Sequence, residues 1–355
     1  MYKLELQNIQ KKFSNKNVLD GLNLQVKKGE RISILGPSGC GKSTTLSIVA
    51  GLIDDFEGKV ILDGEDITSK AANKRNIVIV NQENLLFPHM NVYENIAFGL
   101  RVRKKSKDEI DKKVRELLSD IGLEGYEKKK VSMISGGEKQ RVALARALAV
   151  EPEVLLLDEA YSSLDTNLRE RMRELTIGLQ KKHNTTMILV THDKEEAILF
   201  SDRIAIMLNG KLEQIDYPEE VYTNPKTKAA AKFMVDDNFI EIDGATILIK
   251  PEDIDIYKEA DVQNDFENAL NKFVKENINL EGKVFSAEVK KVVYSGTKMK
   301  YILNVGERTL KVDDFDMNRY EVGDKIGIVV KKTNIYRDLV ILWKKLFTIA
   351  TILWA

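Results

Sequence analysis

GPSGCGKST, residues 36–44, has the spacing G-x-x-x-x-G-K-[ST] of a phosphate-binding loop. The apolar run RISIL precedes it at residues 31–35, and TTLSIVA follows it at residues 44–50 with helical spacing that ends before Gly51. Strand, glycine loop and helix in this order predict a nucleotide-phosphate site rather than an ordinary glycine turn.

The residue types of the loop suit a bound phosphate. Glycines let the backbone curl so that successive N–H groups point inward, and the following helix N-terminus adds partial positive charge. Lys42 is expected to reach the β- and γ-phosphates, and Ser43 to offer its hydroxyl to Mg²⁺. We expect the whole loop to contact the nucleotide, which adds Gly36, Pro37, Ser38, Gly39, Cys40, Gly41 and Thr44.

Composition, charge balance, the first residues and the cysteine count limit the class of protein and its location. The 355 residues are 43% hydrophobic and 31% charged, as in a soluble protein of two or three domains. The 55 basic residues balance the 55 acidic ones, which disfavours nucleic acid as a partner. Residues 1–9 lack the features of a signal peptide, so a cytosolic location is expected. Cys40 is the only cysteine, so no intrachain disulfide can form, and its oxidation would obstruct the loop.

Two carboxylates end a second apolar run, VLLLDE at residues 154–159. A phosphate loop followed by acids at a strand end is the order that Mg-nucleotide chemistry needs, with Asp158 at the metal and Glu159 beside the attacking water. His192 follows another apolar run at residues 187–190, where ligands bind in open α/β sheets. Taken alone, a histidine in this place is more often structural.

SGGEKQR, residues 135–141, opens a predicted helix. Ser135, Gly136 and Gly137 would present N–H groups to an anion, although a serine cap with glycines is weak evidence by itself. A capping box, SKDE, begins another amphipathic helix, which runs from Ser106 to Gly122.

Two apolar features have two possible roles each. Phe13 lies in a polar link between expected strands at residues 3–9 and 18–26, where it either stacks on a base or joins the core. Residues 85–89 (LLFPH) either fill the core or dock a partner.

After about residue 235 the pattern changes to short alternating strands, typical of a small β-barrel or sandwich. A helical insertion is expected near residues 261–276, packed on the barrel. The sequence thus divides into domains at residues 1–235 and 236–337 and an apolar tail at residues 338–355. The tail is interpreted as a packed helix in preference to a membrane or partner contact, because its uninterrupted part is too short to span a bilayer.

The first domain resembles the ATP-binding subunit of ABC transporters. The resemblance rests on six elements in order: GPSGCGKST, Gln82, ISGGEKQR, VLLLDE, SSLD and His192. It implies an α/β P-loop ATPase domain with a helical subdomain, and ATP with Mg²⁺ as cofactors. It also implies a homodimer closed head to tail, in which Ser135, Gly136 and Gly137 of one subunit meet the ATP on the phosphate loop of the other.

The resemblance assigns further roles residue by residue. Glu159 looks like the general base and His192 like the γ-phosphate contact, which with Lys42 makes the expected catalytic set. Gln82 looks like a Mg²⁺ ligand beside Ser43 and Asp158, and it would report to membrane subunits. Phe13 looks like the adenine-stacking aromatic, and Asp165 would communicate across the dimer.

Residues 87–100 and IKPEDIDIY at residues 249–257 make the whole chain look like importer ATPases of the polyamine, iron, sulfate, phosphonate and sugar group. Their C-terminal domain is similar to an OB-like fold called TOBE. The resemblance implies ATP-driven import of a small solute, best matched by a polyamine (spermidine or putrescine) or ferric iron, through separate permease subunits. An extracytoplasmic solute-binding protein would act indirectly, and this chain would sit peripherally on the cytoplasmic face of the membrane.

Three departures from this group affect expectations of regulation and substrate rather than of activity. Ala160 and Tyr161 stand where the group usually has Pro and Phe, a helical insertion splits the C-terminal domain, and the tail is extra. None of the three touches an expected phosphate contact.

The alternative functions are a non-transport ABC ATPase and a nucleotide-binding regulator. The stretch between the phosphate loop and SGGEKQR is too short for the long coiled coil of DNA-repair ATPases, and a second cassette of the translation-associated type is missing. An exporter half would include its own membrane helices. A regulator would be expected to lose Glu159 or Ser135, and both are present.

Overall fold

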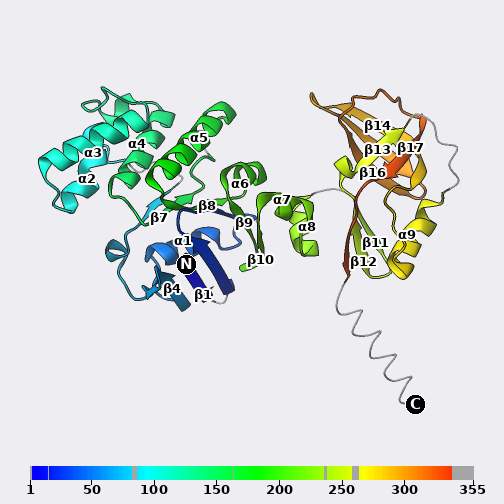
Figure 1. Cartoon of the computed structure of the whole chain (residues 1–355), viewed down its shortest axis with the longest axis horizontal. Coiled ribbons are helices and arrows are strands. Elements are labelled where there is room, and N and C mark those ends of the chain that lie inside the picture. Colours follow the sequence, from blue (N-terminus) through cyan, green and yellow to red (C-terminus); the bar gives the residue numbers. More distant parts are fainter. Residues whose placement is uncertain are drawn as a thin grey trace, which may run out of the picture. The chain divides into compact units, whose positions relative to one another are not determined.

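The computed structural model describes residues 2–14, 16–81, 86–162, 164–235, 238–257 and 264–337. The chain forms two compact units, the first ending at Thr223 and the second beginning at Asn224, each drawn in Figure 1. By its contacts, helix α8 (Lys228–Met234) belongs to the second unit. A domain boundary at residue 235 stays a prediction.

The first unit is built on a six-stranded sheet in the order β10-β9-β3-β8-β7-β6. Its strands are β3 (Arg31–Leu35), β6 (Ile77–Val80), β7 (Val154–Asp158), β8 (Thr186–Thr191), β9 (Arg203–Leu208) and β10 (Lys211–Asp216). All neighbours are parallel except β10 and β9. Because β3, β8 and β7 are parallel and adjacent, the loops that follow them meet at one edge of the sheet.

A second, antiparallel sheet has the order β2-β1-β4-β5. It consists of β1 (Tyr2–Phe13), β2 (Lys16–Lys27), β4 (Glu57–Leu62) and β5 (Glu65–Asp66). The expectation that Phe13 lies in a link between two shorter strands was wrong. Backbone pairing continues past the apolar alternation, through several register shifts, and pairs Phe13 with Lys16 at the end of a long hairpin.

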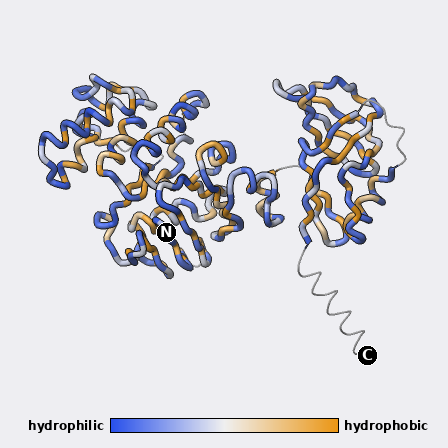
Figure 2. Tube along the Cα trace, viewed as in Figure 1, coloured by the Kyte–Doolittle hydropathy of each residue, from blue (hydrophilic) through white to orange (hydrophobic). Residues whose placement is uncertain are grey.

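Helices cover both faces of the parallel sheet. They are α1 (Lys42–Ala50), α2 (Val92–Val102), α3 (Lys107–Asp120), α4 (Gly136–Ala149), α5 (Thr166–His183), α6 (Lys194–Phe200) and α7 (Pro218–Thr223). Strand β7 contributes side chains to two hydrophobic cores. Leu155 and Leu157 pack with residues of α2 to α5 on one face of the sheet. Val154 and Leu156 pack with α1 and the antiparallel sheet on the other face. Successive strand residues point to opposite faces, so a continuous apolar run is required. Figure 2 shows hydrophobic residues in the interior of this unit and hydrophilic ones around its outside.

Capping boxes mark the start of α2, α3 and α4. The box predicted at Ser106 and Glu109 is confirmed, and α3 begins after it. Helix α2 was not predicted, yet Asn91 and Glu94 form an equivalent box at its start. The S-x-x-E signature has an Asn-x-x-Glu variant, which is the signal that would have found α2.

The second unit is rich in β-structure, as expected. One sheet has the order β11-β12-β18 and the other the order β13-β17-β14-β15-β16. The strands are β11 (Phe239–Ile242), β12 (Ala245–Leu248), β13 (Ile254–Tyr257), β14 (Val284–Tyr294), β15 (Met299–Val305), β16 (Arg308–Asp314), β17 (Lys325–Val330) and β18 (Asn334–Arg337). The larger sheet curls until β13 approaches β16, which fits an OB-like fold.

The expected insertion contains helix α9 (Phe266–Glu276). Its apolar face is buried in the core of the second unit, where the ring of Phe266 lies edge-on to Phe285 at 4.9 Å. Residues 261–263 of the insertion and the tail at residues 338–355 lie outside the described residues. In the part of the chain that the structure describes, no helix is long and apolar enough to cross a membrane.

Candidate functional site

The phosphate loop joins β3 to α1 and needs glycine at two of its positions. A Cβ on Gly36 would lie 2.2 Å from the carbonyl oxygen of Met207. Gly41 has a φ of 110°, which side chains rarely adopt, and its Cβ would lie 2.8 Å from the carbonyl oxygen of Val18. Only glycine therefore allows the curl that turns the backbone N–H groups inward.

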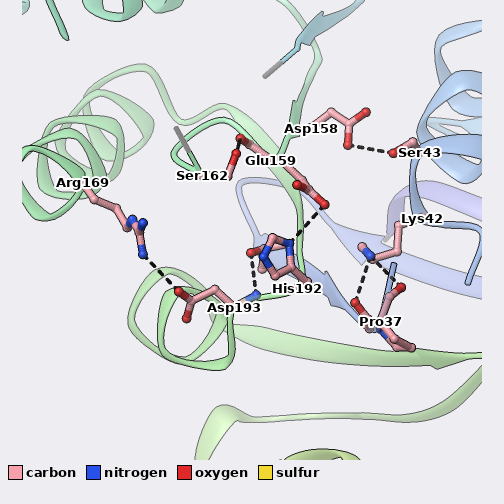
Figure 3. A network of polar contacts seen from close by, with 11 residues as sticks. Pro37, Lys42, Ser43, Asp158, Glu159, Ser162, Arg169, His192 and Asp193 are labelled. Atoms are coloured by element: carbon pink, nitrogen blue, oxygen red, sulfur yellow. Dashed lines mark hydrogen bonds and ion pairs between the residues drawn. The ribbon is translucent and has the colours of Figure 1, made fainter. Parts of the chain in front are cut away.

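Lys42 follows this curl as the first residue of α1. It is only 4% exposed, and its ammonium donates to the carbonyl oxygens of Gly36 at 2.9 Å and Pro37 at 3.0 Å (Figure 3). The positive charge is thus held against the loop. Cys40, within the loop, is buried, and burial raises the pKa of its thiol.

Asp158 and Ser43 come together from β7 and α1. The hydroxyl of Ser43 donates to Oδ1 of Asp158 at 3.0 Å (Figure 3). Burial raises the pKa of Asp158, and the charge of Glu159 adds to this effect. A hydroxyl and a carboxylate are hard oxygen ligands, the kind that Mg²⁺ prefers.

Glu159 stands next to Asp158 in a strained conformation, with a φ of 47°. Its N–H still donates to the carbonyl oxygen of Val190 at 3.0 Å, which holds the turn against β8. One carboxylate oxygen lies 3.3 Å from Nδ1 of His192, at the end of β8 (Figure 3). Strained backbone is often stored at functional sites, and here it aims a carboxylate at an imidazole.

Among the described residues, Phe13, Ser135, Gly136 and Gly137 make no bond to this cluster. Phe13 is 47% exposed at the tip of the β1–β2 hairpin, with the ammonium of Lys11 4.7 Å from its ring centroid. Gln82 lies outside the described residues. Ser135 caps α4, and among the described residues neither it nor Gly136 or Gly137 bonds to the phosphate loop. One chain therefore brings Lys42, Ser43, Asp158, Glu159 and His192 together (Figure 3). Residues 135–137, here called the SGG segment, do not bond to this group among the described residues.

Phe87, from the apolar patch at residues 85–89, lines a cavity of about 380 Å³. Leu85 of this patch lies outside the described residues. Phe87 is half-buried, with its ring centroid 4.6 Å from that of Phe98 and 5.2 Å from the guanidinium of Arg146. Asn95 holds the backbone of Phe87 through its side chain. Neither Phe98 nor Arg146 was predicted to lie beside Phe87, because they come from α2 and α4 and no local pattern brings the two helices together.

Comparison with known proteins supports the same chemistry. A family model described as "ABC transporter" matches residues 19–162. A spermidine/putrescine import ATP-binding protein, PotA, from Spiroplasma citri is 40% identical, over 97% of this chain and 98% of its own length. The chain belongs to the ABC transporter family. It is an ATP-binding subunit, and hence an ATPase coupled to transport.

Two further relatives of this ABC ATPase extend the comparison. A ferric-ion import ATP-binding protein, FbpC 1, from Pectobacterium atrosepticum is 47% identical over 66% of this chain and 67% of its own length. Among solved structures, cbiO1 of the cbiONQ ABC transporter complex from Clostridium perfringens superposes with a TM-score of 0.59 and 32% identity, covering 63% of this chain and 91% of its own.

Proposed function

We propose that this ABC ATPase drives import of a polyamine, spermidine or putrescine. The observation that carries this proposal is the extent of the similarity. The polyamine relative from Spiroplasma citri matches over 97% of this chain, so it includes the second unit, whereas the ferric-ion relative matches over 66%. Ferric iron is the second candidate, because the identity to that relative over the shared part is higher, at 47%.

The phosphate site fits ATP with Mg²⁺. The glycine loop and Lys42 would bind the phosphates, and Phe13 would stack on the adenine from its exposed place at the hairpin tip. Ser43 and Asp158 would hold Mg²⁺, joined by Gln82. The ion, when bound, neutralises charge on the phosphates.

Glu159 and His192 would act on the γ-phosphate. The carboxylate of Glu159 would orient and deprotonate the attacking water as a general base. His192 would contact the γ-phosphate while its Nδ1 stays beside Glu159, 3.3 Å away. The left-handed backbone at Glu159 supports this assignment, because it turns the chain at the end of β7 so that the carboxylate lies beside His192.

A second copy of the chain would complete the site. Ser135 and Gly136 are exposed at the N-terminus of α4, whereas Gly137 is buried. Among the described residues none of the three bonds to its own phosphate loop, so the exposed end of the helix is available to an ATP on another subunit. Permease subunits would dock at the Phe87 cavity, a solute-binding protein would deliver cargo to them, and the chain would lie peripherally on the cytoplasmic face of the membrane.

Replacing Glu159 by Gln tests hydrolysis and cargo together. Loss of a positioned general base typically costs about 10²- to 10⁴-fold in rate, so purified Glu159→Gln protein should retain ATP but not hydrolyse it. Cells that carry this variant as their only copy should lose uptake of labelled spermidine and putrescine and keep uptake of ferric iron. Loss of iron uptake alone would reverse the cargo assignment. Undiminished hydrolysis would refute Glu159 as the base, and normal uptake of both solutes would point to a different cargo for the importer.

Replacing Phe87 by Ala tests the docking surface. Because Phe87 is half-buried against Phe98 and Arg146, we expect the isolated chain to keep its melting temperature within a few degrees and its basal hydrolysis, while uptake in cells falls. Leu199→Ala, at an exposed apolar residue, is the matched control and should leave uptake intact. A large drop in melting temperature for Phe87→Ala would instead assign the side chain to the core.

A further inference from the structure

Arg169 links two loops that follow neighbouring strands. It lies in the first turn of α5, and one guanidinium nitrogen, Nη1, lies 3.2 Å from Oδ2 of Asp193 (Figure 3). The other, Nη2, donates to the carbonyl oxygen of Leu164 at 3.2 Å. Leu164 belongs to the turn after β7, and Asp193 follows β8, so one planar side chain bonds both loops at once.

Each end of this link is one residue away from a predicted site residue. Leu164 precedes Asp165, whose side chain caps α5 and whose carbonyl accepts the N–H of Arg169 at 2.9 Å. Asp193 follows His192 and is itself held, since Oδ1 accepts the N–H of Glu196 at 3.1 Å and its N–H donates to Thr191 at 3.0 Å.

We propose that Arg169 is a positioning residue that fixes His192 relative to the turn carrying Asp165, through its ion pair with Asp193. The inference rests on the proposed role of His192 in hydrolysis. Arg169 does not touch the predicted phosphate site; it acts on the backbone next to His192, whose imidazole lies 3.3 Å from Glu159. Small misplacements of such groups cost about 10²-fold in rate.

Substitutions at both partners test the link in the full-length chain. Arg169→Met and Asp193→Asn should each lower kcat for ATP by about 10- to 100-fold, with KM changed by less than about twofold, because ATP binding does not use the pair. The double variant should lose no more than either single variant, since one interaction is removed only once. Arg169→Lys should recover only part of the rate, because a single ammonium replaces a fork that holds two acceptors.

Arg171→Met is the matched control, because Arg171 is an exposed residue two positions further along the same helix. It should leave kcat unchanged. Melting temperatures of all variants separate a lost link from a lost fold. If Arg169→Met fails to fold, Arg169→Lys and Asp193→Asn carry the test.

A readout without nucleotide is available because the chain has only three histidines. Imidazole resonances of His192 in NMR spectra should shift in Arg169→Met and Asp193→Asn, while those of His183, bonded to Asp120, stay in place. Arg171→Met should shift neither. Unmoved His192 resonances together with a parental kcat in Arg169→Met would overturn the proposal. A parental chain that does not hydrolyse ATP, or a His192→Ala variant with full activity, would instead overturn the proposed function.

Discussion

Helices α3 and α4 both begin with a Ser-x-x-Glu capping box. In α3 the N–H of Ser106 donates to Glu109 at 2.9 Å, and the N–H of Glu109 donates back to the Ser106 hydroxyl at 3.3 Å. In α4 the corresponding distances between Ser135 and Glu138 are 2.7 Å and 3.3 Å. The pKa of Glu109 in α3 and that of Glu138 in α4 are both lowered, mainly because the backbone N–H of the capping serine donates to the carboxylate. Local geometry therefore does not distinguish a structural cap from a functional one.

The two helices differ in the two residues that lie between the capping serine and the glutamate. Helix α4 has Gly136 and Gly137 there, whereas α3 has Lys107 and Asp108. The first N–H groups of any helix have no partner within it, and glycine leaves them uncovered. A Cβ on Gly136 would meet nothing within 4 Å, so that position opens outward from its own chain. The carboxylate of Asp108 would repel an anion at the same place in α3. We infer that, of these two helices, α4 presents an anion site and α3 does not.

Replacing the capping serine by arginine in each helix tests this comparison with the largest expected effect. Each of Ser135→Arg and Ser106→Arg removes a cap, so each should cost about 1 kcal/mol of stability. Only Ser135→Arg should also lose hydrolysis, because removing preorganised donors to a γ-phosphate costs about 2 to 4 kcal/mol of transition-state stabilisation. Melting curves and ATPase rates of the two proteins give the comparison. Equal rates would make the α4 box purely structural.

A smaller effect is expected from Gly136→Ala. The methyl group has open space in its own chain but would occupy the face where the partner's ATP is proposed to sit, so we expect a loss of about 10-fold in hydrolysis. Gly178→Ala in α5 is the matched control, because a Cβ there also meets nothing within 4 Å. Both changes should keep or raise the melting temperature. Full activity of Gly136→Ala would place the ATP elsewhere.

Sequence reasoning predicted the elements whose chemistry is local. The glycine loop, the acids at the end of β7 and the Ser106 box each depend on residues adjacent in the chain, and β3 has the bounds of the apolar run at residues 31–35. The alternation after residue 235 predicted a small β-barrel or sandwich, and the resemblance to importer ATPases implied the OB-like fold that the curled sheet fits. The predicted site roles stay predictions that the geometry supports.

Features that depend on distant residues were beyond the sequence. The contact of Arg169 with Asp193 joins positions on different elements, and no periodicity signals it. The cavity beside Phe87 needs Arg146 from α4 and Phe98 from α2. Phe13 was misplaced because backbone pairing, rather than side-chain pattern, extends the β1–β2 hairpin.

Hydrolysis by a mixture of two inactive variants tests the composite site most directly. In a heterodimer of Ser135→Arg and Lys42→Ala subunits, one of the two sites carries both defects and the other carries neither. If the SGG segment of one subunit completes the phosphate site of the other, mixing the two proteins should restore partial ATPase activity, although each alone is nearly inactive. A mixture whose rate stays at the average of its two components, across the full range of mixing ratios, would contradict the head-to-tail site.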